Sequence, residues 1–176
     1  MSVATNGCRG TRSGVAWRNS WRGRSKMSSR PVPWTLDANI ILRYVLDDNE
    51  ELTAKAERIW QAIEDGAVTA VLDPVTLAEV VFVLASVYRL PNATISEAVL
   101  PLLQVEGVRM HNRERYLHAL RLFGTTVKHF GDACACATAL GETSGLLYSF
   151  DRGMPEIAGL RRAEDFGDME REQPQE

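Results

Sequence analysis

The sequence predicts an α/β fold with a mostly parallel central sheet. Short apolar segments, rich in β-branched residues, alternate along the chain with longer segments whose apolar residues recur at helical spacing. Two of the short segments end at an aspartate directly before a helix is expected to begin. No internal repeat interrupts this order, and 176 residues suffice for one domain with an apolar core of its own.

Caps and turn residues divide the first part of the chain. The apolar stretch at 34–36 ends in Asp37, and a helix over 39–46 follows, with apolar residues at a period of 3.6. A short polar break then caps a helix over 50–65, which Gly66 terminates. The first expected strand is therefore followed by two helices.

The next strand and helix carry the strongest local signals. The strand, over 68–72, is short and β-branched. Asp73 as N-cap and Pro74 at the first helical position then begin a helix that extends to about residue 88. This helix is apolar almost all round except for Glu79, so we expect the core or another subunit to cover most of it.

The second half of the chain continues the alternation and ends with an edge strand. Capping residues, apolar periodicity and glycines define its elements. They are a helix that opens at Thr94, a strand over 105–110, a helix over 113–128, a small-residue helix from Gly131 to 140, a strand over 145–150 that ends at Asp151, and a final strand over 160–163.

The net charge of −3 conceals an uneven distribution of charge. Residues 1–33 contain seven basic residues and no acidic one, which leaves 13 basic against 23 acidic residues, a net charge of −10, in residues 34–176. An acidic domain of this kind does not suggest a broad nucleic-acid-binding surface. If it handles nucleic acid, cations and local basic patches have to offset its own field.

The two ends of the chain are expected to lie outside the folded domain, which we place at residues 34–166. The acidic tail, 167–176, is expected to be disordered. The basic segment 1–33 is rich in Arg, Ser and Gly and lacks the apolar region of a signal peptide. Three interpretations of it stay open: an arm that contacts RNA, a targeting segment, or residues that are not native, with Met27 as an alternative start.

Several classes of protein are disfavoured. No window approaches the roughly 18 apolar residues of a membrane helix, so we expect a cytoplasmic protein without a membrane partner. Three cysteines, Cys8, Cys134 and Cys136, do not make a disulfide framework and, without a cluster of His, do not suggest a zinc site. The motifs of P-loop proteins, serine hydrolases, zinc proteases and dinucleotide-binding domains do not occur in the sequence.

Four acidic side chains occupy positions that suggest a site. Asp37 and Asp151 each end an expected strand. Asp132 begins the small-residue helix, and Glu79 interrupts the apolar one. Each has a local explanation when taken alone, as an Asx turn, a turn residue, an N-cap or a solvent-facing charge.

Taken together, the four carboxylates favour a metal centre. Carboxylates that converge at one sheet edge repel one another unless some are protonated or cations lie among them. Hard divalent cations prefer oxygen ligands, and two of them about 4 Å apart can clamp the attacking and leaving oxygens of a phosphodiester displacement. The sequence therefore favours metal-dependent cleavage of phosphodiesters.

The segments that carry these residues resemble a known family. They are Asp37-Ala38-Asn39, Thr76-Leu77-Ala78-Glu79-Val80, Phe130-Gly131-Asp132-Ala133 and Ser149-Phe150-Asp151-Arg152. In this order they look like the four motifs of the PIN-domain nucleases, and the resemblance spans the whole expected domain. A single small PIN domain is similar to the ribonuclease toxins of VapBC-type toxin–antitoxin pairs.

The resemblance implies a three-layer α/β/α fold and an endoribonuclease that depends on Mg²⁺ or Mn²⁺. It also implies a homodimer and a small antitoxin protein as partner. Asn39 and Thr76 match polar positions that support the family's site. The residues that match its catalytic, metal-binding carboxylates are Asp37 and Asp132 as the main ligands, and Glu79 and Asp151 as residues that bind or orient through water.

Basic side chains near the carboxylates are candidates for contacts with RNA phosphates. Arg43 and Arg152 lie close in sequence to acidic residues. Four more fall near one face of the helix over 113–128, namely Arg115, His118, Arg121 and Lys128. The alternative for all six is an ordinary solvated surface.

Two departures from the family pattern are visible. Gly153 and Pro155 follow the last motif and are expected to loosen the segment after Asp151. The basic segment at the start of the chain is not part of the pattern, so nothing about its role carries over.

Two other functions stay open. One is a PIN-like module that binds RNA or protein without cutting it. The other is a receiver-type signalling domain, which needs a Lys near the end of the last strand, where the chain has only Arg161 and Arg162.

Overall fold

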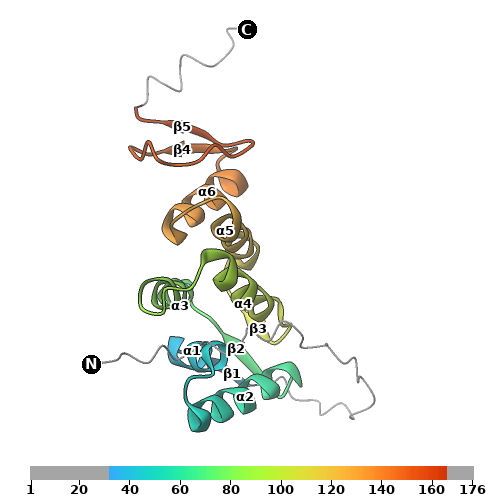
Figure 1. Cartoon of the computed structure of the whole chain (residues 1–176). Coiled ribbons are helices and arrows are strands. Elements are labelled where there is room, and N and C mark those ends of the chain that lie inside the picture. Colours follow the sequence, from blue (N-terminus) through green and yellow to red (C-terminus); the bar gives the residue numbers. More distant parts are fainter. Residues whose placement is uncertain (1–31, 166–176) are drawn as a thin grey trace, which may run out of the picture. The chain divides into compact units, whose positions relative to one another are not determined.

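The computed structural model describes residues 32–165, in which helices alternate with parallel strands (Figure 1). The mixed α/β architecture expected from the sequence is confirmed. The strands are β1 (Val32–Thr35), β2 (Val68–Val71), β3 (Val108–Arg109), β4 (Leu146–Tyr148) and β5 (Arg161–Ala163). The helices are α1 (Ala38–Leu46), α2 (Glu50–Glu64), α3 (Pro74–Ser86), α4 (Asn92–Gln104), α5 (Arg113–Thr125) and α6 (Phe130–Glu142).

The first sheet contains β1, β2 and β3 in that order, and all its strands are parallel. Thr35 lies opposite Val71, and the backbone N–H of Leu36 extends the pairing by donating to the carbonyl of Val71 at 2.9 Å. Because the strands are parallel, their carboxyl ends share one edge of the sheet. Asp37 and Asp73 follow the ends of neighbouring strands at this edge.

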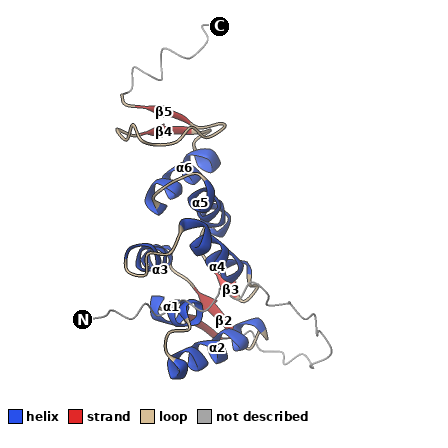
Figure 2. Ribbon diagram, viewed as in Figure 1, coloured by secondary structure: helices blue, strands red, loops and turns tan. Residues whose placement is uncertain are grey.

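The last two strands form a separate parallel sheet, so the described residues contain two sheets where the sequence suggested one (Figure 2). A tight turn between α6 and β4 leads into the second sheet. Ser144 and Gly145 both have positive φ, at 54° and 81°, and the N–H of Gly145 returns to the carbonyl of Ala139 at 2.7 Å. The strand that follows is thereby held at the end of α6 and pairs with β5.

The apolar core is built mainly from the helices. Fully buried side chains come from each described helix, and they include Leu84, Ile95 and Leu120. Two aromatic pairs support this core: Tyr44 stacks on Trp60 with ring centroids 5.2 Å apart, and Phe123 meets Phe130 edge-on at 5.7 Å. Burial of these apolar side chains is the main source of stability for the fold.

Helices α4 and α5 approach each other closely at Gly124. A Cβ atom at this position would lie 2.6 Å from the Cβ of Ser96 and 2.8 Å from its Oγ. The Ser96 hydroxyl is buried and donates to the carbonyl of Leu120 at 2.8 Å. The crossing therefore requires glycine on α5 and a small, hydrogen-bonded residue on α4.

Some element boundaries differ from those expected. Strand β3 contains only two residues instead of the six at 105–110, because α4 extends to Gln104 and the backbone of Gly107 passes close to α2. A Cβ at Gly107 would lie 2.5 Å from the carbonyl oxygen of Ile63. Strand β1 begins at Val32, two residues before the start expected from the sequence. Most of the basic segment, up to 31, and the tail from 166 lie outside the described residues.

Candidate functional site

Asp37 stands between β1 and α1 and acts as the N-cap of that helix. Its Oδ2 accepts hydrogen bonds from the backbone N–H of Asn39 at 3.2 Å and from the side-chain amide of Asn39 at 3.0 Å. Both side chains are exposed. Because both donors bind Oδ2, the amide of Asn39 orients the carboxylate, and Oδ1 has no hydrogen-bond partner among residues 32–165.

Asp73 occupies the corresponding position after β2 and was not among the expected site residues. It is the N-cap of α3, as the sequence predicts, and its Oδ1 accepts the N–H of Val75 at 2.8 Å. The parallel pairing of β1 with β2 also places it at the same sheet edge as Asp37. The signal was present in the sequence as a repeated pattern, Leu36-Asp37 and Leu72-Asp73, each directly before a helix.

Helix α3 carries two further candidates. Thr76 lies in the first turn and is half-buried, whereas Glu79 is exposed one turn later. With a rise of about 1.5 Å per residue, Glu79 is ~7.5 Å along the axis from the first residue of the helix. Since α3 contacts α1, the helices that bear Asp37 and Glu79 are neighbours.

Asp132 lies in the first turn of α6 and is half-buried. A negative charge is stabilised there by the helix dipole. Burial raises the pKa of the neighbouring Cys136 thiol, and the charge of Asp132 raises it further. Helix α6 contacts α3, so the elements that carry Asp132 and Glu79 also adjoin.

Asp151 is exposed in the loop after β4 and forms a local turn. Its Oδ1 accepts the N–H of Gly153 at 2.8 Å, and its own N–H donates to the Oγ of Ser149 at 3.0 Å. It belongs to the second sheet, which no strand pairing joins to β1 within the described residues. Across residues 32–165, no three Asp, Glu, His or Cys side chains converge closely enough to hold a metal ion.

A comparison with family models decides the family. The PIN domain model matches residues 35–160, which is more than half of the chain and includes all four acidic candidates. The chain belongs to the PIN domain family. The three-layer α/β/α fold class expected from the sequence is thereby confirmed. No curated protein matches the chain. PIN domains are generally nucleases, typically bind RNA and generally use divalent metal ions.

Arg43, which the sequence suggested for phosphate contacts, forms an ion pair with Asp48 within this PIN domain. Nη1 of Arg43 lies 2.6 Å and 2.7 Å from the two carboxylate oxygens of Asp48, and the hydroxyl of Tyr88 donates to Oδ2 of Asp48 at 2.9 Å. These contacts connect the end of α1 to the residues that follow α3. The hydrogen bond and charge of Arg43 lower the pKa of the Asp48 carboxyl.

The pH dependence of stability tests this network. Because the fold lowers the pKa of Asp48, its contribution is present above the ordinary value of about 3.9 and is lost as pH falls through the lowered value. We expect Asp48→Asn to lower the free energy of unfolding at pH 7, with a smaller difference from wild type at pH 3, measured by urea denaturation. If Asp48→Asn lowers the free energy of unfolding by the same amount at both pH values, the stabilising effect of the Asp48 charge is contradicted. Glu57→Gln, an exposed charge on α2, is the matched control.

Two of the other basic candidates also have carboxylate partners, and one lies elsewhere than expected. Nε and Nη2 of Arg152 lie 3.1 Å and 3.2 Å from the carboxylate of Glu164, on the surface. Arg115 pairs with Glu142 at 2.9 Å. Helix α5 ends at Thr125, so Lys128 does not share its face as predicted.

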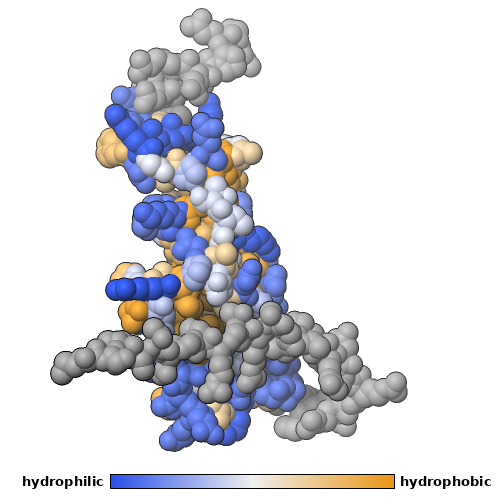
Figure 3. Space-filling view, in the orientation of Figure 1, coloured by the Kyte–Doolittle hydropathy of each residue, from blue (hydrophilic) through white to orange (hydrophobic). Residues whose placement is uncertain are grey.

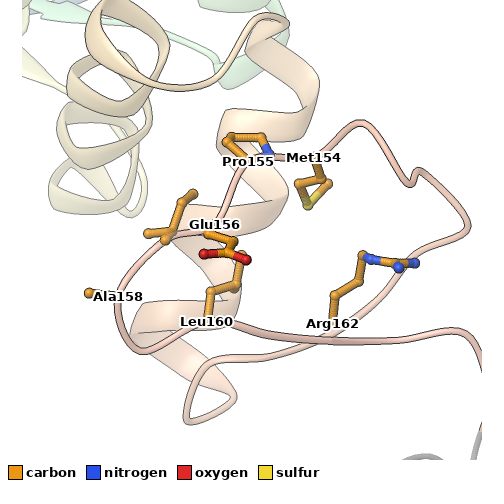
Figure 4. A pocket seen from close by; sticks show the side chains of 7 residues that line it. Met154, Pro155, Glu156, Ala158, Leu160 and Arg162 are labelled. Atoms are coloured by element: carbon orange, nitrogen blue, oxygen red, sulfur yellow. The ribbon is translucent and has the colours of Figure 1, made fainter.

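Two pockets of the PIN domain lie apart from the four acidic candidates. One, of about 580 Å³, is formed by the loop after Asp151 and is lined by residues between Met154 and Arg162 (Figure 4). The other, of about 460 Å³, lies between α5 and α6 and includes Arg115 and His118. None of the four carboxylates lines either pocket.

The two thiols of α6 have raised pKa values because of burial. Burial raises the pKa of Cys134 to about 11. Neither Cys134 nor Cys136 is therefore a nucleophile at neutral pH.

Within residues 32–165, none of the helices has the length and apolar character that a bilayer-spanning segment needs.

Proposed function

We propose that this PIN domain is a Mg²⁺- or Mn²⁺-dependent endoribonuclease that acts in the cytoplasm as the toxin of a toxin–antitoxin pair. The observation that carries the proposal is Asp37, at the carboxyl edge of a parallel sheet, with one oxygen held by Asn39 and the other available. In open α/β sheets this edge is where ligands bind. The family match supports a nuclease with all four acidic motifs.

The donor chemistry of the candidate residues fits a hard divalent cation, because carboxylate oxygens are the ligands that Mg²⁺ and Mn²⁺ prefer. Asp37 and Asp132 would hold it, and Glu79 and Asp151 would bind it or orient water. A bound cation supplies Lewis acidity toward the scissile phosphate. Asn39 keeps the Asp37 carboxylate oriented, and Thr76 provides a hydroxyl one turn before Glu79. Arg43 and Arg152 contact phosphate only after exchanging their carboxylate partners.

Protein partners are supported by the surface of α3. Val75 and Phe82, which lie on either side of Glu79 along the helix, are 75% and 65% exposed. Apolar side chains interrupt the polar surface elsewhere as well (orange in Figure 3). An exposed apolar stripe beside a carboxylate suits an antitoxin segment that pairs apolar with basic residues. A homodimer is part of the same proposal.

Metal dependence tests the nuclease proposal directly. We expect the purified full chain to cleave tRNA, rRNA or mRNA with Mg²⁺ or Mn²⁺ and to lose this activity in EDTA. Gel electrophoresis of labelled RNA measures the cleavage. Restoring the cation should restore cleavage. Binding of RNA without cleavage, under all metal conditions, would replace the proposal by that of a silent binding module. Equal cleavage in EDTA would refute the metal-dependent mechanism.

A further inference from the structure

Asp73 is an acidic residue that lies at the candidate sheet edge but outside the four segments that match the motifs of the family. It follows β2, the middle strand of the first sheet, whereas Asp37 follows the neighbouring strand β1. The family generally uses divalent metal ions, so a cation is the ligand expected at this edge. The position of the Asp73 carboxylate relative to Asp37 shows whether it suits the same cation.

The pairing of β1 with β2 places the two aspartates next to each other. Thr35 lies opposite Val71 in the parallel register, and the N–H of Leu36 continues the pairing by donating to the carbonyl of Val71 at 2.9 Å. Two residues beyond this pair, one chain segment reaches Asp37 and the other reaches Asp73. Neighbouring strands lie about 4.8 Å apart, so the two aspartates are neighbours across the sheet.

Both aspartates also direct their side chains to the same side of the sheet. Their backbones are extended, with φ and ψ of −90° and 153° at Asp37 and of −78° and 141° at Asp73. Leu36 and Leu72, the residues directly before them, are 4% and 2% exposed, whereas both aspartates are exposed. Because side chains alternate along an extended chain, each buried leucine places the following carboxylate on the open side.

Helix capping uses only one oxygen of each carboxylate. Oδ1 of Asp73 accepts the N–H of Val75 at 2.8 Å, and Oδ2 of Asp37 accepts the two donors of Asn39. The other oxygens, Oδ2 of Asp73 and Oδ1 of Asp37, accept no hydrogen bond from residues 32–165. Each aspartate can therefore cap its helix and bind a cation at the same time.

The charges at this edge favour two carboxylates over one. Helices α1 and α3 begin at the neighbouring strand ends, and each carries roughly half a positive charge at its N-terminus. Neither helix has an acidic residue in its first turn, so the N-cap aspartates are the negative charges that face these two helix ends. Asp37 alone would leave a local charge of about zero, which does not attract a divalent cation. With Asp73 the local charge is about −1.

We propose that Asp73 is a ligand of the same divalent cation as Asp37. The inference rests on the proposed function, because the cation is the one that the nuclease would use. Asp73 contributes its free oxygen from the middle strand of the sheet, and its hydrogen bond to Val75 fixes the carboxylate before the cation arrives. The remaining coordination positions are left for Asp132, for water and for the phosphate of the substrate.

Binding of Mn²⁺ to the full chain without RNA tests the proposal independently of activity. Electron paramagnetic resonance of unbound Mn²⁺ measures the Kd. We expect Asp73→Asn to raise this Kd at least about 10-fold, since even residues that only support a metal ligand typically contribute 10–100-fold to metal affinity. Asp37→Asn should have a similar effect, and Glu57→Gln, which removes an exposed charge on α2, should have none.

Unfolding in EDTA separates loss of a ligand from loss of the helix cap. Asparagine and serine cap helices about as well as aspartate, so Asp73→Asn and Asp73→Ser should unfold at the same temperature as wild type when no metal is present. Both should bind Mn²⁺ more weakly. Weaker binding in only one of them, together with a lower unfolding temperature, would mean that Asp73 acts through the fold and would overturn the proposal.

The remaining outcomes distinguish this inference from the proposed function. If Asp37→Asn weakens Mn²⁺ binding and Asp73→Asn does not, Asp73 is no ligand, and the proposed site stands without it. If Asp73→Asn removes one of two bound ions and leaves the affinity for the other unchanged, the shared cation is overturned. If both variants bind Mn²⁺ more weakly but wild type cleaves no RNA, the shared cation stands and the nuclease function fails.

Wild-type protein that binds no Mn²⁺ would overturn the shared cation and the metal-dependent mechanism together.

Discussion

Replacing Asp37 by asparagine is expected to lower RNA cleavage by at least about 100-fold. The loss of a carboxylate that holds a catalytic cation removes several kcal/mol of transition-state stabilisation, and each 1.36 kcal/mol corresponds to about a factor of ten. Asparagine caps helices as well as aspartate does, so the acceptor for the N–H of Asn39 is kept. The measurement is kcat/KM on a short RNA under Mg²⁺, with circular dichroism to verify the fold.

Two matched variants make the Asp37 result specific. Glu57→Gln also removes one exposed negative charge, on α2, and should leave cleavage unchanged. Asp73→Asn removes the charge at the neighbouring strand end while keeping the cap of α3. Full activity in Asp37→Asn would refute the placement of the site at this edge, and a comparable loss in Asp73→Asn would add Asp73 to it.

The second large effect concerns stability. Gly124→Ala should lower the free energy of unfolding by about 1–3 kcal/mol, because the added methyl group overlaps Ser96 at the crossing of α4 and α5. Elsewhere in a helix the same substitution is stabilising, by roughly 0.5–1 kcal/mol. Urea denaturation followed by circular dichroism measures the difference.

Gly141 supplies the matched control for Gly124. It lies in α6, and a Cβ there would meet nothing within 4 Å. Gly141→Ala should therefore stabilise the protein. If both alanine variants are more stable than wild type, the close approach of α4 and α5 at Gly124 is refuted. If both are less stable, the loss in Gly124→Ala does not come from this close approach.

Local signals were sufficient for most of the helices. The N-cap at Asp73 and the proline after it predicted the start of α3, and the structure shows this start, with the capping hydrogen bond to Val75. The stop at Gly66 was predicted in the same way, since a positive φ there suits glycine. Helix caps and helix terminators depend on contacts within a few residues, so the local sequence is sufficient to predict them.

Non-local contacts were not predictable. The shortness of β3 depends on the approach of the Ile63 carbonyl to Gly107, and these two residues are far apart in sequence. The pairing of β4 with β5 in a separate sheet, and the left-handed conformation of Ser144 before β4, were not predicted from the local sequence. Pairing partners are chosen by tertiary contacts, which hydrophobic periodicity does not encode.

The places of the candidate residues at strand ends and on helices could be predicted from the sequence, whereas their arrangement in space could not. Asp37 was expected at a strand end and is found there, with Asn39 as its hydrogen-bonding partner. Asp151 was expected beside it but lies in the second sheet. The ion pair of Arg43 with Asp48 was also not foreseen, because a basic residue near a carboxylate in sequence does not reveal which carboxylate it contacts.

The buried thiol of Cys136 and the half-buried thiol of Cys134, both on α6, have a practical consequence. Cys136 is fully buried and donates to the sulfur of Met154 at 3.7 Å, and the pKa of Cys134 is about 11. Alkylating reagents attack the thiolate, so the fully buried Cys136 reacts only when α6 opens locally and exposes it. The rate at which Cys136 becomes labelled, measured by mass spectrometry, thus reports the opening equilibrium of the helix that carries Asp132, without any engineered probe.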